Sequence, residues 1–162
     1  MSVAALGFTR YFDQKSKADA ASGGANAMTV KAAPPPEPQS YRTVALQADR
    51  HGHFRIEARV DGRPVEFVVD TGASSIVLNE KSAAWLGIHP AARDYTVRTQ
   101  TANGIGKAAR VRLTQVEVNG IAVRDVDALV VPDESLSVNL LGMTFLSRVK
   151  WTHDRGRLVL EQ

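Results

Sequence analysis

The chain has 162 residues, 44% of them hydrophobic and 23% charged, which suits one domain with a hydrophobic core and leaves too little length for two large ones. Its net charge of +3 comes from basic residues scattered along the chain, so the composition does not favour nucleic-acid binding. It has no cysteine, which excludes disulfide bonds and thiolate metal sites, and no run of ~18 apolar residues long enough to cross a membrane as a helix.

The first 40 residues differ in composition from the rest. Ala18–Ala27 consists largely of Ala, Ser and Gly, and Ala33–Pro38 is a proline-rich stretch that cannot donate the hydrogen bonds of a sheet. We therefore expect residues 1–40 to be a flexible or semi-rigid leader, and a short helix over Leu6–Lys17 is compatible with the pattern. The folded domain is expected over residues 41–162.

From residue 41 onward, alternation of polar and apolar residues predicts half-buried strands. The first two are expected over Thr43–Ala48 and His53–Val60. A turn at Asp61-Gly62 leads to a strand over Val65–Val69, which runs directly into Asp70.

The middle of the chain predicts a short buried strand over Ile76–Leu78 and then a helix over Glu80–Leu86, which Asn79 caps and Gly87 ends. Two further strands, Tyr95–Thr101 and Lys107–Val118, are expected on either side of the glycine-containing segment Ala102–Gly106.

The last third continues the β pattern. Asn119-Gly120 is a strong hairpin signal that leads into a strand over Ile121–Val131. An apolar run over Val138–Leu141 then precedes Gly142, and a closing hairpin is expected to pair Val149–His153 with Arg157–Glu161. The sequence thus predicts a mainly β domain with one or two short helices.

Asp70 stands where a buried strand ends and the chain must turn. Three apolar residues, Phe67–Val69, precede it, and Thr71-Gly72 and two small residues follow. A carboxylate at such a place is partly desolvated while the N–H groups of the turn can hydrogen-bond to it, which suits a group that stays ionised and holds a water. Asp and Gly are common turn formers, however, so the bare triplet is more often a simple turn.

The surroundings of the triplet favour a catalytic interpretation. The segments Phe67–Ser75 and Asn139–Leu146, with a second apolar-apolar-Gly element at Leu140-Leu141-Gly142, resemble those of the retroviral-type (retropepsin-like) aspartic peptidases, and the single-domain bacterial members in particular. The resemblance covers residues 41–162. It implies a closed β-barrel of the acid protease fold, with one lobe per chain.

The resemblance also implies roles for individual residues. Asp70 would be the catalytic carboxylate, Thr71 would bond across a dimer, and Gly72 would let the loop approach the substrate. Leu141 and Gly142 would support the loop by packing against it. The substrate would contact residues of the loop and of a flap formed by Thr99–Gly106, namely Ala73, Ser74, Ala102, Asn103, Gly104 and Ile105. Its side chains would fill pockets that are expected to include four apolar residues, Ile76, Val77, Leu136 and Leu140.

Hydrolysis of this kind uses two carboxylates about 3 Å apart that share one proton. The chain has ten aspartates, and only Asp70 is followed by Thr-Gly or Ser-Gly. One chain therefore cannot supply the pair, and we expect a C2 homodimer with the active site on its axis. In retroviral enzymes the chain termini hold the dimer together, and the leader and the closing hairpin differ from that arrangement here.

Other interpretations of the sequence stay open beside this one. The chain could be a retropepsin-like peptide-binding or dimerisation module with weak or no hydrolysis. No metal or other cofactor is expected, because the four histidines lack ligand spacing, and neither Ser74 nor Ser75 has the surroundings of a nucleophile. Trp85 and Trp151 are expected in the core or at an interface, and Asp125 and Asp127 are expected to face solvent.

The leader suggests a location. Bacterial proteins of the family that the chain resembles commonly follow an N-terminal membrane anchor, and a proline-rich tether suits a domain that hangs from a bilayer. We therefore expect a bacterial envelope protein that faces the periplasm, with any anchor outside this chain. An extended, accessible leader is also a candidate site for self-cleavage.

Overall fold

Strands dominate the computed structural model, which describes residues 42–101 and 104–162. Within these residues the chain forms ten strands, two short α-helices and one 3-10 turn. The elements in chain order are β1 (Thr43–Gln47), β2 (Arg55–Val60), β3 (Arg63–Val69), β4 (Ile76–Asn79), α1 (Glu80–Trp85), η1 (Ala92–Asp94), β5 (Val97–Thr101), β6 (Gly104–Val118), β7 (Ile121–Val131), β8 (Asn139–Leu141), α2 (Met143–Leu146), β9 (Lys150–Asp154) and β10 (Arg157–Glu161).

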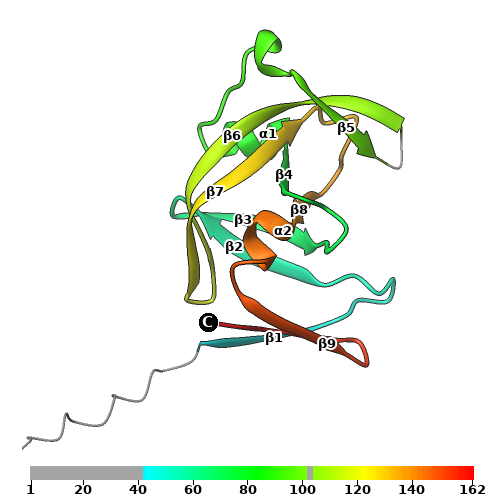
Figure 1. Ribbon diagram of the computed structural model, residues 1–162, viewed down its shortest axis with the longest axis vertical. Coiled ribbons are helices and arrows are strands. Elements are labelled where there is room, and N and C mark those ends of the chain that lie inside the picture. Colours follow the sequence, from blue (N-terminus) through cyan, green and yellow to red (C-terminus); the bar gives the residue numbers. More distant parts are fainter. Residues whose placement is uncertain (1–41, 102–103) are drawn as a thin grey trace, which may run out of the picture. The chain divides into compact units, whose positions relative to one another are not determined.

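The larger sheet closes into a barrel (Figure 1). Its strand order is β2-β3-β8-β4-β7-β6-β5, and β2 pairs again with β6 through Arg59 opposite Glu117 and Val60 opposite Val116. The strands β2, β3, β8, β4, β7 and β6 therefore form a closed six-stranded barrel, which leaves only β5 outside the ring. Alternate residues of β2 point into the core, as a strand with one buried face requires. The predicted closed β-barrel with two short helices is confirmed.

A second, three-stranded sheet has the order β1-β10-β9 and lies on the far side of α2 from the hairpin β5–β6 (Figure 1). Arg42, just before β1, donates a hydrogen bond to the carbonyl oxygen of Gly120 in the β6–β7 turn. Gln162 exchanges two hydrogen bonds with the backbone of Ala122. The first and last strands of the domain are therefore paired within one chain and fastened to the barrel.

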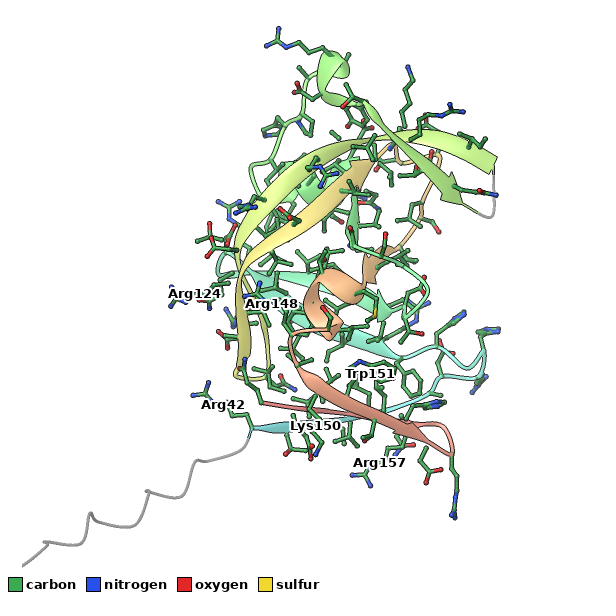
Figure 2. All side chains as sticks on the ribbon, viewed as in Figure 1. Arg42, Arg124, Arg148, Lys150, Trp151 and Arg157 are labelled. Atoms are coloured by element: carbon green, nitrogen blue, oxygen red, sulfur yellow. The ribbon has the colours of Figure 1, made fainter. Side chains whose placement is uncertain are left out.

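Cations gather near this small sheet (Figure 2). Lys150 forms an ion pair with Glu161 at 2.6 Å, and Arg148 donates hydrogen bonds to the carbonyl oxygens of Arg124 and Asp125. Trp151 is half-buried and packs against the core, as its sequence context predicts. These contacts fix the closing hairpin to the end of the barrel.

The local turn predictions are confirmed. Asp61-Gly62 and Asn119-Gly120 both adopt the two successive positive φ angles of a tight hairpin turn. Asn79 caps α1 by accepting a hydrogen bond from the backbone N–H of Ser82 at 2.8 Å. Gly87, with φ +81°, follows that helix.

Three features differ from the sequence-based expectations. The predicted loop over residues 102–106 is shorter, because Gly104 pairs with Thr101 and Gly106 pairs with Thr99 as part of the β5–β6 ladder. The 3-10 turn η1 was not predicted. Trp85 is 60% exposed, so the expectation that it lies in the core is wrong while the expectation of an interface stays a prediction, and the guanidinium of Arg63 lies 6.0 Å from its ring centroid.

The leader expected over residues 1–40, its Leu6–Lys17 helix, and residues 102 and 103 lie outside the described residues. The described residues all belong to a unit that extends over Pro38–Gln162. None of the helices in residues 42–101 and 104–162 has the length and hydrophobicity to cross a membrane.

Candidate active site

Asp70 follows the last residue of β3 and begins a tight loop. Its backbone N–H donates to the carbonyl oxygen of Leu141 at 3.1 Å, and its own carboxylate Oδ1 accepts a hydrogen bond from the N–H of Gly72 at 2.8 Å. The N–H of Ala73 closes the turn onto the carbonyl oxygen of Asp70 at 3.3 Å. The half-buried carboxylate is thus oriented by the backbone of its own loop, in the way the sequence suggests.

The loop rests on the segment that follows β8. This strand runs parallel to β3, with Val69 opposite Leu141. An added Cβ on Gly142 would lie 2.2 Å from the carbonyl oxygen of Ser75 and 2.6 Å from that of Ala73, although the φ of Gly142, −99°, is ordinary. Glycine is therefore needed at position 142 for space rather than for backbone conformation.

Two hydrogen bonds complete the junction. The N–H of Met143 donates to the carbonyl oxygen of Ala73 at 2.8 Å. The N–H of Ile76 donates to the hydroxyl of Thr144 at 2.9 Å. Together with the bond from Asp70 to Leu141, they tie residues 70–76 to residues 141–144. The structure places Leu141 and Gly142 against the Asp70 loop, where the resemblance implies they pack.

Asn139 is a further structural residue that sequence reasoning missed. It is 7% exposed. Its amide Nδ2 donates to the carbonyl oxygen of Glu66 and to the hydroxyl of Ser82, both at 2.9 Å. Its Oδ1 accepts from the N–H of Asn79 at 3.1 Å. One buried side chain thereby joins β3, β4, α1 and β8, beside the end of β3 that leads into Asp70. The only indication of this role in the sequence is that Asn139 is a polar residue directly before the apolar pair Leu140-Leu141.

A cavity of about 680 Å³ opens beside Asp70. Strand pairing explains how its wall is built. Leu140, Val77, Leu129 and Arg110 stand opposite one another in turn on β8, β4, β7 and β6, so they form one row across the sheet. The cavity is lined by Asp70, Gly72, Ala73, Ser74, Ser75, Val77, Val97, Arg98, Thr99, Gln100, Arg110, Asp127, Ala128, Leu129, Val131, Leu136 and Leu140.

Not all the residues predicted to bind substrate lie at this cavity. Gly72, Ala73 and Ser74 line it, as do three of the four apolar residues expected in the pockets, Val77, Leu136 and Leu140. Ile76 does not, because it is fully buried on the opposite side of β4.

The flap residues and Thr71 are placed differently. Gly104 and Ile105 are exposed residues at the start of β6 and do not line the cavity, and Ile105 is 69% exposed. Ala102 and Asn103 lie outside the described residues. Thr71 is exposed beside Asp70 and is not part of the cavity wall.

The charged residues of the cavity were missed. Arg98, Arg110 and Asp127 all line it. Asp127 shares its side of β7 with Leu129 at the cavity, but 44% of its side chain stays exposed, and Asp125 is exposed outside the cavity, so both aspartates face solvent as expected. Because Ala128–Val131 is a continuous apolar run, the sequence does not show which residues of β7 lie on the cavity side.

Tyr95 lies near the start of β5 and donates its hydroxyl proton to Glu80 Oε1 at 2.6 Å. Partial burial, the hydrogen bond and the negative charges of Glu80, Asp133 and Asp94 raise the pKa of Tyr95 to about 12. This contact joins the base of the β5–β6 hairpin to α1. Within residues 42–101 and 104–162 no cluster of three His, Asp or Glu side chains could hold a metal ion.

Comparison with known proteins places this fold and site in a family. A model of the gag-polyprotein putative aspartyl protease family matches residues 56–148, a span that includes the Asp70 loop and Leu141-Gly142. The chain belongs to this family.

Relatives of known sequence and structure agree with the match. The chain is 38% identical over 117 residues, 72% of its length, to an uncharacterised protein encoded 5′ of cobV in a Sinorhizobium species. It is also 38% identical over 110 residues, 67% of its length, to an uncharacterised protein of Rickettsia prowazekii (strain Madrid E). It spans about half the length of these two relatives, 50% and 47%.

A crystal structure of a retropepsin-like aspartic protease from Rickettsia conorii superimposes with a TM-score of 0.67 and 36% identity, covering 75% of this chain and 91% of that one. The fold is therefore that of a retropepsin-like aspartic peptidase, as the motifs predict.

Proposed function

We propose that this chain is an aspartic endopeptidase that acts as a C2 homodimer, with one Asp70 from each protomer. The observation that carries the proposal is the Asp70 loop itself. Its carboxylate is held by the Gly72 N–H, its backbone is clamped by residues 141–144, and it opens onto the cavity. Membership of an aspartyl protease family supports the same chemistry.

The chemistry follows from bringing two such loops together. Carboxylates about 3 Å apart share one proton, because two like charges that close cannot both ionise. The ionised Asp70 takes a proton from a water, and the water oxygen attacks the scissile carbonyl carbon. The protonated Asp70 of the other protomer donates a hydrogen bond to the carbonyl oxygen, and the tetrahedral intermediate then collapses as its nitrogen is protonated.

The geometry of the Asp70 loop is also consistent with secondary roles for its neighbours. Thr71 is exposed at the tip of the loop, where its hydroxyl can bond the backbone of the second protomer. A peptide would lie extended along the cavity, where backbone hydrogen bonds give affinity and side-chain pockets give selectivity. Ala73 and Ser74 line the floor, and residues 102–105 would approach the peptide from the flap.

Peptide cleavage by matched variants tests the proposal. The wild type is incubated with a library of tryptic peptides from a bacterial proteome, and new termini are identified by mass spectrometry. Asp70→Asn is expected to lower cleavage by about 1000-fold or more. Asp125→Asn, which removes an exposed carboxylate outside the cavity, is expected to cleave like the wild type. Equal cleavage by wild type and Asp70→Asn overturns the proposal. Dimerisation and peptide binding without cleavage would identify a binding module instead.

We also propose that residues 1–40 tether the domain to the outer face of a bacterial inner membrane through an anchor outside this chain, and that this tether is cut by the enzyme itself. The Ala-, Gly- and Pro-rich composition supports an extended, accessible segment. Mass spectrometry of the incubated protein tests self-cleavage. An N-terminus that stays intact in active wild-type enzyme argues against it, and Asp70→Asn serves as the inactive control.

A further inference from the structure

Arg110 occupies a distinctive place in the cavity wall. It stands directly opposite Leu129 on β7, and Leu129 stands opposite Val77 on β4. Residues that pair directly in a sheet project from the same face, so the Arg110 side chain lies on the cavity side with these two apolar residues. A guanidinium thus ends a row that is otherwise apolar.

Arg110 differs from the next arginine on the same face of β6. Arg112 forms an ion pair with Asp127, Nη2 to Oδ1, at 3.1 Å, and it does not line the cavity. No ion pair or side-chain hydrogen bond to Arg110 occurs within residues 42–101 and 104–162. The one wall carboxylate near it, Asp127, is already engaged by Arg112, so the charge of Arg110 stays available to a ligand.

A second cation adds to this charge. Arg98, on β5, also lines the cavity and has no ion-pair partner within the same described residues. Its neighbour across the ladder is Lys107, another cation. The wall formed by β5 and β6 therefore has positive character, whereas the floor holds Asp70.

We infer that this cavity selects peptides that carry an acidic side chain, which Arg110 binds with Arg98 as a secondary contributor. Guanidinium groups bind carboxylates through paired, charge-assisted hydrogen bonds. Arg110 is exposed in the free chain, so a peptide carboxylate can reach it, and a bound peptide that covers the neighbouring apolar residues would exclude competing water and strengthen the interaction. This inference rests on the proposed peptidase function and adds the substrate class to it.

The sheet also indicates where in the peptide the acid belongs. Asp70 follows β3, and Arg110 on β6 lies four strands from β3 in the order β3-β8-β4-β7-β6. Strands are about 4.8 Å apart and an extended peptide covers about 3.3 Å per residue, so the acidic residue is expected within about six positions of the scissile bond. Because a C2 dimer presents Arg110 twice, the preference is expected on both sides of that bond.

The test starts from a cleavage site found in the tryptic peptide library. Synthetic peptides of that site carry either Glu or Gln at each of the neighbouring positions in turn, and kcat/KM is measured at about pH 6, where glutamate is ionised. For the wild type we expect Glu to be preferred over Gln by about tenfold at one position or more.

Four variants assign the preference to its residue. Arg110→Gln is expected to reduce the Glu-over-Gln ratio to about one to two, and Arg110→Lys to restore part of it because the charge returns without the paired geometry. Arg124→Gln is the control, because Arg124 is an exposed cation of β7 outside the cavity, and it is expected to keep the wild-type ratio. Adding Arg98→Gln to Arg110→Gln is expected to remove any remaining preference.

The outcomes separate this inference from the peptidase proposal. Asp70-dependent cleavage without a Glu preference, or a preference that survives in Arg110→Gln, overturns the inference and leaves the peptidase standing. An equal loss of preference in Arg110→Gln and Arg124→Gln overturns the assignment to Arg110. Absence of Asp70-dependent cleavage overturns both. Each variant's circular dichroism and thermal unfolding are measured first, and the Arg110→Lys result decides the matter should Arg110→Gln unfold.

Discussion

Gly142 lies so close to Ser75 that a Cβ atom on it would stand 2.2 Å from the Ser75 carbonyl oxygen. The two residues come from segments more than sixty positions apart, one after β8 and one in the Asp70 loop. The neighbouring bond from the Met143 N–H to the Ala73 carbonyl oxygen, at 2.8 Å, holds them in this position. The shape of the Asp70 loop therefore depends on an absent side chain elsewhere in the chain.

Replacing Gly142 by Ala is expected to lower the free energy of unfolding by about 3 kcal/mol, because backbone atoms must move to admit the methyl group. The kcat/KM of peptide cleavage is expected to fall by more than the loss of folded protein explains, because the displaced loop carries Asp70. Urea denaturation and kcat/KM measure the two effects. Gly106→Ala is the control, because its Cβ would meet only Thr99 Oγ1 at 3.6 Å and Ser135 Oγ at 4.0 Å. Equal stability of Gly142→Ala and wild type would contradict the packing described.

Replacing Asn139 by Ala is expected to lower the free energy of unfolding by about 2 kcal/mol, because three part-buried groups lose the hydrogen bonds that one buried amide gives them. Asn79→Ala provides a scale, since it removes a helix cap and is expected to cost about 1 kcal/mol. Thermal and urea unfolding measure both. If Asn139→Ala costs no more than Asn79→Ala, the hydrogen bonds of Asn139 contribute less than their burial implies.

Tyr95 is expected to ionise near pH 12, because its partial burial and its hydrogen bond to Glu80 favour the protonated phenol. The folded chain therefore holds a proton that the unfolded chain releases from about pH 10 upward, so this group's contribution to stability is lost as pH rises from 10 toward 12. Alkaline absorbance titration of the wild type minus Tyr95→Phe isolates this phenol. Glu80→Gln should lower its pKa. An unchanged value in Glu80→Gln would exclude the carboxylate as a cause.

If the active site is formed by two chains, an inactive variant is expected to inhibit the wild type by forming mixed dimers with it. When wild-type protein is mixed with a ninefold excess of Asp70→Asn and the chains associate at random, only about one tenth of the wild-type chains pair with another wild-type chain. Activity per wild-type chain is expected to fall to about that fraction after the mixture equilibrates. A ninefold excess of Asp125→Asn is the control, and because that variant is expected to cleave like the wild type, activity per total chain is expected to stay unchanged. Unchanged activity per wild-type chain would show that one Asp70 suffices.

Much of the local structure could be predicted because it depends on neighbours in the chain. Asp61-Gly62 and Asn119-Gly120 favour tight hairpin turns wherever they occur between strands, and Asn79 can satisfy the first turn of a helix without help from elsewhere. The Asp70 loop could be recognised for a similar reason, since its motif consists of five consecutive residues, Asp70–Ser74.

Apolar runs hid the rest, because alternation is uninformative where both neighbours are apolar. In Ile76–Leu78 the sequence did not show that Val77 alone faces the cavity, and it is pairing with Leu129 and Leu140 that decides this. The same ambiguity around Leu129 concealed that Asp127, and Arg110 through its pairing with Leu129, line the cavity. Asn139 looked like an ordinary polar residue, because its three partners are 57 to 73 positions away in the chain.

By itself, then, the sequence determined the mainly β composition of the domain, its hairpin turns and the identity of the Asp70 loop, because these depend on residues close together in the chain. Only the tertiary structure decided that Gly142 must lack a side chain, that Asn139 joins four elements, and that Arg110 lines the cavity. Each of these depends on the strand order of the barrel, which places β3, β8, β4, β7 and β6 side by side although β3, β4 and β8 are far apart in the chain.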